Sequence, residues 1–272
     1  MNINKWRAVS AKLKQMGSVG VAFSGGVDSS VLLKLAVDIL GENAAAVTFV
    51  SPLMPESELS EAKKFAKEIG ARHYTIETND LALEELRENS KERCYYCKKR
   101  RLEQAIKWAD DNRILYIIEG SNADDKMDFR PGMRVLTELA PRVYSPFLEI
   151  GVTKKEIRQQ AEKMGLPNWN KPSAACLASR IEYNTELSAA RLKAIEKAED
   201  YLRGMIKGYL RVRNNGMIAR IEVAKEEMPI LLEKSLEINH VLKDFGFWYV
   251  TLDLGGYRQG SQNDIFSKER FS

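Results

Sequence analysis

The chain has 272 residues, of which 44% are hydrophobic and 29% charged, a balance typical of a soluble protein with one large domain or two smaller ones. It contains no apolar run of about 18 residues, which argues against a membrane span, and its N-terminus has no apolar signal core, so we expect a cytoplasmic protein. The net charge of +4 suits ligands that carry phosphate and is too small to indicate nucleic-acid binding by itself.

The first half of the chain alternates short apolar runs with amphipathic segments, which predicts strands alternating with helices. The expected strands are 18–23, 45–50, 72–76, 115–119 and 143–147. The expected helices are 28–40, 55–69, one near 98–109, and 153–164. This rhythm predicts an α/β fold built on a doubly wound parallel sheet, in a first domain at residues 1–182.

The pattern changes in the remaining residues, 183–272. Long helices are expected at 186–206 and 226–245, and strands at 210–213, 217–223 and 248–254. Asn214-Asn215-Gly216 is a strong hairpin-turn signal between the first two of these strands. We therefore expect a small α+β domain here, suited to substrate binding or oligomerisation.

A glycine-rich segment lies between the first expected strand and the first expected helix. Its residues are Ser24, Gly25, Gly26, Val27, Asp28 and Ser29. The pair of glycines could be only a tight turn, with Asp28 or Ser29 capping the helix. The complete S-G-G-x-D-S string in this position instead favours a loop whose backbone amides and helix dipole bind an anion.

This segment resembles the PP-loop of the ATP-pyrophosphatase superfamily, whose sheet is of the adenine nucleotide hydrolase type. The resemblance implies that the six residues bind ATP, which is cleaved between its α- and β-phosphates, and that AMP is attached to a substrate oxygen. Asp28 is a candidate ligand for Mg2+, since hard carboxylate oxygens suit that ion.

A second polar segment, 120–132, follows the fourth expected strand. In open α/β sheets ligands bind at this end of the strands. The segment could be a solvated acidic turn, but its three aspartates beside Arg130 fit a loop that binds metal and substrate. Asp125 and Asp128 are the candidate metal ligands.

The chain has three cysteines, Cys94, Cys97 and Cys176, an odd number that argues against a disulfide framework. The C-x-x-C pair could be a redox dithiol, half of a metal site or two buried thiols. The neighbouring Arg and Lys side chains favour the thiolate form of both cysteines in this pair. Cys176 could be a buried small residue, although its small neighbours and the following Ser-Arg favour a functional loop.

Four features together resemble the LarE family over nearly the whole chain: the PP-loop, R-C-Y-Y-C-K, EGSNADD with DFRPG, and C-L-A-S-R after a Lys-Pro pair. The family consists of ATP-dependent sulfur transferases that act in synthesis of the nickel-pincer nucleotide cofactor. The resemblance implies that ATP adenylylates a carboxylate of a pyridinium dicarboxylate mononucleotide. A sulfur nucleophile then displaces AMP and leaves a thiocarboxylate.

The source of the sulfur differs within the family. In some members the cysteine matching Cys176 attacks and gives up its own sulfur, so that the enzyme turns over once. In others, three cysteines hold a four-iron four-sulfur (4Fe-4S) cluster, which accepts hydrosulfide from a sulfide donor. Because Cys94 and Cys97 accompany Cys176, the resemblance favours the cluster type, with Cys176 as the catalytic cysteine.

In the second domain, Arg211 and Arg213 alternate along an expected strand and therefore share a face, where they could bind a phosphate or be merely solvated. The resemblance implies two further sets of residues. Those that contact substrate are Ser179, Arg180, Arg211 and Arg213. Those near a bound metal are Glu199 and Glu222, although the third acid of that site has no clear match. Homo-oligomers are also implied.

Three other functions fit parts of the sequence. A tRNA-thiolating enzyme with an Fe–S cluster would share the PP-loop and the three cysteines, but the weak net charge makes a nucleic-acid partner unexpected. A ligase that uses ammonia would leave the cysteines without a role. The intact S-G-G-V-D-S loop beside a cysteine loop argues against a non-enzymatic ATP sensor or Fe–S carrier.

Overall fold

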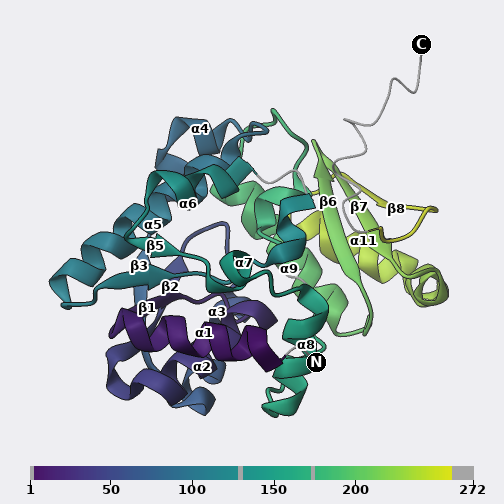
Figure 1. Ribbon diagram of the computed structural model, residues 1–272. Helices are drawn as coiled ribbons and strands as arrows, with labels where there is room; N and C mark the ends of the chain where they lie inside the picture. Colours follow the sequence, from purple (N-terminus) through teal and green to yellow (C-terminus); the bar gives the residue numbers. More distant parts are fainter. Residues whose placement is uncertain (1–2, 128–130, 173–174, 259–272) are drawn as a thin grey trace. The chain divides into compact units, whose positions relative to one another are not determined.

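The computed structural model describes residues 3–127, 131–172 and 175–258 (Figure 1). It divides into two compact units: Met1–Asp80 with Lys91–Ala174, and Leu81–Ser90 with Ala175–Ser272. These bounds differ from the expected ranges because residues 81–90 and 175–182 join the second unit. Backbone bonds hold the shorter segment there, since the amide of Leu187 donates to the carbonyl of Arg87 at 2.7 Å and that of Asn184 to Asn89 at 3.1 Å.

The first unit is built on a five-stranded sheet. Its strands are β1 (Val19–Ala22), β2 (Ala44–Val50), β3 (Arg72–Glu77), β4 (Tyr116–Ile118) and β5 (Val143–Tyr144). The order is β3-β2-β1-β4-β5, and every neighbouring pair is parallel. Parallel strands require crossover connections, which the intervening helices supply. The predicted α/β fold with a parallel sheet is thus confirmed.

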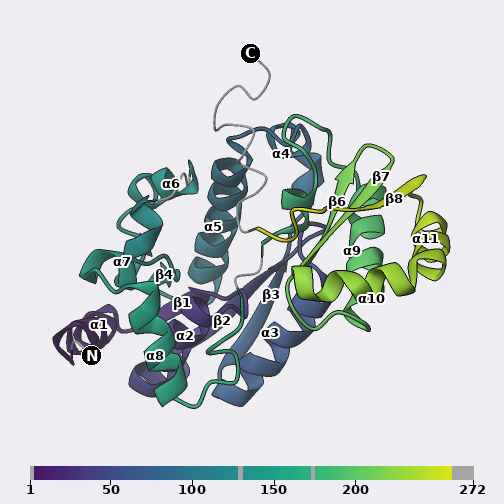
Figure 2. The same cartoon turned by 90° about the vertical axis from the view of Figure 1, so that its right-hand side faces the viewer.

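Helices cover both faces of this sheet (Figure 2). They are α1 (Ile3–Met16), α2 (Val27–Leu40), α3 (Glu56–Ile69), α5 (Arg93–Asp111), α6 (Arg134–Glu138), α7 (Pro146–Ile150) and α8 (Lys154–Lys163), with 3-10 turns at Gly41–Asn43, Asp80–Ala82, Ala123–Met127 and Pro131–Met133. Side chains of α1, α2, α3 and α8 form one buried core, and those of α5 and α6 contribute to another. The sheet is therefore wound on both faces.

Two elements of this unit differ from the expectations. Helix α1 has no counterpart among the expected elements, although Trp6, Val9 and Leu13 form a buried face at helical spacing. The expected strand at 143–147 ends at Tyr144, because Pro146 takes the first position of α7. Proline favours that position, since its missing N–H is not needed in the first helical turn.

The second unit contains a separate three-stranded sheet. Its elements are α4 (Glu84–Arg87), a 3-10 turn (Leu177–Arg180), α9 (Ala189–Arg203), β6 (Leu210–Asn215), β7 (Ile218–Val223), a 3-10 turn (Lys225–Glu227), α10 (Met228–Glu233), α11 (Ser235–Asp244) and β8 (Tyr249–Leu252). Strands β6 and β7 are antiparallel and β8 is parallel to β7. The hairpin turn is where it was expected, with Gly216 at φ +67°. The expected helix at 226–245 is interrupted at Lys234.

None of the described helices is both long enough and apolar enough to cross a membrane.

Candidate functional site

The glycine-rich segment forms a tight loop between β1 and α2. Gly25 has φ +73°, and a Cβ on it would lie 3.2 Å from the Cα of Ala62 in α3, so both conformation and space require glycine. The hydroxyl of Ser29 donates to the carbonyl of Gly26 at 3.0 Å and accepts from the amide of Ser24 at 3.3 Å. The loop therefore curls around the N-terminus of the 14-residue helix α2, where backbone amides favour an anion.

The loop lies where the strand order reverses. From β1 the chain moves outward to β2 and β3, and it later returns to β4 on the other side of β1. The segment after β4 approaches the glycine-rich loop closely: a Cβ on Gly120 would lie 3.1 Å from both the Cβ of Asp28 and the amide nitrogen of Ser29. Such a topological switch point is the usual ligand site of a doubly wound sheet.

Asp28, in the first turn of α2, is largely buried, and only one of its two carboxylate oxygens has a partner among the described residues. Its Oδ2 forms an ion pair with the Nζ of Lys154 in α8, whereas its Oδ1 is buried without a hydrogen-bond partner among the described residues. Burial raises the pKa of Asp28 and Asp125 raises it further, while Lys154 opposes both effects. An unpartnered buried carboxylate oxygen fits a site for a hard cation such as Mg2+.

Of the two metal ligands expected in the second polar segment, the structure describes one, Asp125. Asp125 is 7% exposed, and its Oδ2 accepts a bond from the amide of Asn122 at 2.9 Å. Its negative charge adds to the rise in the pKa of Asp28. Asp128 lies outside the described residues. The roles of Asp125 and Asp128 in metal binding therefore stay predictions.

Glu119, at the end of β4, is the centre of a polar cluster that the sequence reasoning missed. One carboxylate oxygen accepts from the Nζ of Lys98 at 3.1 Å and from the hydroxyl of Ser121 at 2.8 Å. The other accepts from the hydroxyl of Ser145 and from the amide of Ser121 at 3.1 Å. Its position directly after an apolar strand was the available signal. The cluster brings α5, which carries the C-x-x-C pair, to the same end of the sheet.

None of the three cysteines is in a disulfide. Cys94 and Cys97 lie near the start of α5, and their spacing places the two thiols on one side of the helix. Cys94 is exposed and Cys97 half-buried. Cys176, in the second unit, is also exposed and directly precedes the 3-10 turn Leu177–Arg180. No group of three His, Cys, Asp or Glu side chains positioned to hold a metal occurs within the residues that the structure describes.

The second unit brings the expected substrate residues into one buried polar network. Arg180 binds Glu199 through two bonds of 3.0 and 2.9 Å, and Arg213 binds Glu222 in the same way at 3.0 and 2.9 Å. Arg213 also donates to the carbonyl of Ser179 at 2.7 Å. Both carboxylates bind arginines, so a metal ion would have to share the oxygens of Glu199 and Glu222 with these guanidinium groups. The role of the two glutamates as metal ligands stays a prediction.

Arg211 differs from the other two arginines of this network. It is 9% exposed and has no carboxylate partner among the described side chains. Its guanidinium donates to the carbonyl of Leu210 at 2.7 Å and lies 5.7 Å from the ring centroid of Tyr257. Burial, together with the charge of Arg180, lowers its pKa. A buried guanidinium without a carboxylate partner suits an anionic ligand.

Comparison with known proteins agrees with this arrangement. The asparagine synthase family matches residues 6–93, which include the glycine-rich loop. The chain is 35% identical over 263 residues to the pyridinium-3,5-bisthiocarboxylic acid mononucleotide synthase of Lactiplantibacillus plantarum, covering 96% of this chain and 95% of that protein. Uncharacterised proteins of Synechocystis (39% identity, 91% and 92% coverage) and Methanocaldococcus jannaschii (33%, 88% and 90%) are also similar. The chain therefore belongs to the LarE family of the PP-loop superfamily.

Proposed function

We propose that this protein is an ATP-dependent sulfur transferase, which converts a carboxylate of a pyridinium dicarboxylate mononucleotide to a thiocarboxylate during synthesis of the nickel-pincer nucleotide cofactor. The observation that carries the proposal is the match to the L. plantarum synthase over 96% of the chain. The PP-loop at the switch point of the sheet supports the use of ATP with Mg2+. The comparisons give no support to tRNA thiolation over this function.

The first step activates the carboxylate. A carboxylate resists nucleophiles because its charge repels them and oxide is a poor leaving group. Attack of a carboxylate oxygen on the α-phosphorus of ATP forms an acyl adenylate and releases pyrophosphate, which removes both obstacles. The loop amides bind the leaving pyrophosphate, and Lys154 lies beside them as the partner of Asp28. Asp28 and Asp125 would hold a Mg2+ ion, which would neutralise charge on the phosphates.

The second unit supplies the charges for the mononucleotide. Arg211 is the main anion ligand because, within the part of the chain that the structure describes, it has no carboxylate partner. Arg180 and Arg213 are already neutralised by glutamates, so they orient Ser179 and the backbone carbonyls of Ala175 and Cys176 rather than provide free charge. The substrate phosphate and carboxylates are the groups that this network would select.

The sulfur step involves Cys176, and we propose that the protein is of the cluster type. Three thiols outside disulfides, two of them on one side of α5, are suitable donors for a 4Fe-4S cluster with one open iron. Such a cluster, when bound by Cys94, Cys97 and Cys176, would supply hydrosulfide as the nucleophile. The sulfide donor is then a separate molecule, and Cys176 keeps its sulfur.

A direct assay tests the proposed function. The protein is incubated with ATP, Mg2+, sulfide and pyridinium-3,5-dicarboxylate mononucleotide, and the products are separated by chromatography and identified by mass spectrometry. We expect AMP, pyrophosphate and a mononucleotide in which one oxygen has been replaced by sulfur. If no AMP forms, or if AMP forms without transfer of sulfur to the mononucleotide, the proposed function is wrong.

The source of the sulfur is tested on protein prepared without oxygen. About four irons and four acid-labile sulfides per chain would support the cluster. Alanine variants of Cys94, Cys97 and Cys176 should each lose iron and sulfur transfer while adenylylation survives. Full multi-turnover activity in Cys94→Ala would contradict the cluster. Loss of one sulfur atom from Cys176 after a single turnover would identify it as a sacrificial donor.

We further expect a homo-oligomer, as the family resemblance implies. Light scattering coupled to size-exclusion chromatography would measure the mass in solution. A monomer at the concentration used in the assay would contradict this expectation.

A further inference from the structure

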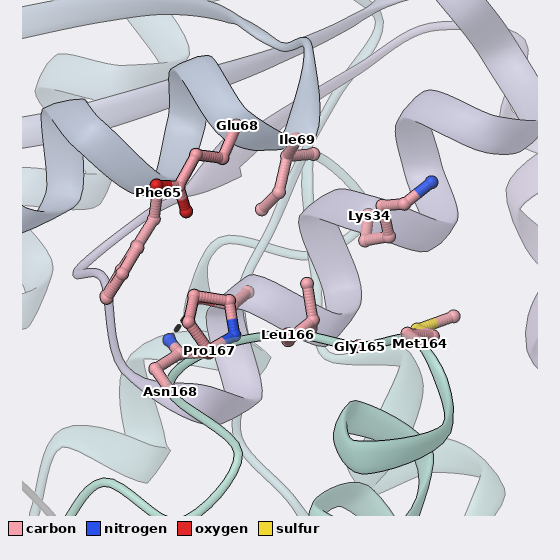
Figure 3. A pocket seen from close by; sticks show the side chains of 10 residues that line it. Lys34, Phe65, Glu68, Ile69, Met164, Gly165, Leu166, Pro167 and Asn168 are labelled. Atoms are coloured by element: carbon pink, nitrogen blue, oxygen red, sulfur yellow. Dashed lines mark hydrogen bonds between the residues drawn. The ribbon is translucent and has the colours of Figure 1, made fainter.

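Asn168 is a buried side chain that connects a distant turn to the PP-loop. It lies after α8, on the turn that also carries Leu166 and Pro167 (Figure 3), and is 4% exposed. Its amide nitrogen donates to the carbonyl of Gly25 at 2.9 Å and to the hydroxyl of Ser30 at 2.8 Å. Both acceptors belong to the loop or to the first turn of α2, 138 or more residues earlier in the chain.

The turn that carries Asn168 is itself held from two sides. Arg158 of α8 donates to the carbonyls of Trp169 and Lys171, each at 2.9 Å. Lys171 in turn forms ion pairs with Glu58, at 2.7 Å, and Glu61 of α3. The position of Asn168 is therefore set by the packed helices of the unit and does not depend on the loop that it contacts.

The bond to Gly25 determines how one peptide group of the loop is oriented. In a trans peptide the C=O and the following N–H point in opposite directions, so a carbonyl directed at Asn168 turns the amide of Gly26 away from it. That amide has only a long contact of 3.3 Å with the hydroxyl of Ser24, which leaves it able to bind an anion. Because glycines flank this peptide, little steric resistance opposes its rotation. A rotated peptide would present its carbonyl oxygen to the anion and repel it.

We propose that Asn168 is a positioning residue for pyrophosphate binding: it holds the Gly25–Gly26 peptide with its N–H towards the β- and γ-phosphates of ATP. The inference rests on the proposed function, which places these phosphates at the loop. It extends that function by naming a residue outside the S-G-G-V-D-S string on which the affinity for pyrophosphate depends.

The test compares Asn168→Leu with Asn170→Leu. Leucine has a similar size and no donor, and a neighbouring cavity of about 150 Å³, lined in part by Phe65 and Ile69, has room for its methyl groups (Figure 3). Asn170 lies on the same turn but is exposed, so it is the matched control. Dissociation constants for ATP, pyrophosphate and AMP are measured with Mg2+ by calorimetry.

We expect Asn168→Leu to bind ATP and pyrophosphate about tenfold more weakly, with AMP affinity unchanged, because AMP lacks the phosphates that the loop binds. Asn170→Leu should match the wild type for all three ligands. Equal affinity of Asn168→Leu and wild type for pyrophosphate would overturn the inference, as would an equal loss of affinity for AMP, which indicates a general structural role.

A second variant covers the case in which Asn168→Leu does not fold. Asn168→Asp keeps the shape but loses the donor and faces the Gly25 carbonyl with an acceptor, so pyrophosphate affinity should fall at least as far. Unchanged affinity in this variant would also overturn the inference. A wild type that binds ATP but makes no thiocarboxylate counts against the proposed function, while the binding series still decides the role of Asn168.

Discussion

We expect the buried ion pair between Arg213 and Glu222 to stabilise the fold, and a test of this also bears on the expected metal site. Glu222 is 1% exposed and binds Arg213 through two bonds, with Arg220 at 3.3 Å from the same carboxylate. Removing one partner of a buried ion pair typically costs about 3–5 kcal/mol, because the remaining charge loses its compensation. Since glutamine can still accept one bond from Arg213, we expect Glu222→Gln to lower the free energy of unfolding by about 3 kcal/mol.

For a chain of this size that loss corresponds to a fall of about 6–12 °C in the midpoint of thermal unfolding. Circular dichroism with EDTA present measures it without any contribution from metal. The exposed Glu226 provides the control, and Glu226→Gln should change stability by no more than about 0.5 kcal/mol. If Glu222→Gln is as stable as the wild type in EDTA, the ion pair does not stabilise the fold, and this outcome would favour a carboxylate kept for a metal.

Three further predictions follow from single side chains. Asp28→Asn should abolish pyrophosphate release without loss of stability, because it removes a largely buried charge; retained release would exclude Asp28 from the ATP site. Burial lowers the pKa of His73 below its usual 6.5, so the unfolded chain binds the proton more tightly than the folded chain. The free energy of unfolding should therefore fall as the pH decreases below about 6.5. Urea unfolding at about pH 7.5 and 5.5 should show a smaller fall in His73→Gln than in the wild type. Arg211→Met should raise the free energy of unfolding by about 1 kcal/mol while weakening mononucleotide binding, and a loss of stability on chemical denaturation would show that Arg211 is structurally required.

Local patterns were sufficient for the parts of the protein that are contiguous in the chain. The strand at 18–23, the S-G-G-V-D-S loop and the following helix were predicted within a residue or two, because glycine conformation and hydrophobic periodicity are properties of neighbouring residues. Thr153, expected at the start of a helix, forms a complete capping box with Glu156. The strand expected through Phe147 is too long, because Pro146 favours the start of a helix and ends the strand before it.

Contacts between distant residues could not be predicted in the same way. From the sequence alone one could infer that a phosphate-binding loop precedes a helix, that a C-x-x-C pair exists, and that arginines alternate on a later strand. The folded structure was needed to show that Asn168 donates to the carbonyl of Gly25 and that Glu119 binds Lys98 and two serines. It was also needed to show that Arg213 has a buried carboxylate partner whereas Arg211, among the described residues, has none. Hydrogen bonds and desolvation depend on which atoms meet after the sheet has assembled, and residues far apart in the chain leave no local pattern that specifies such a meeting.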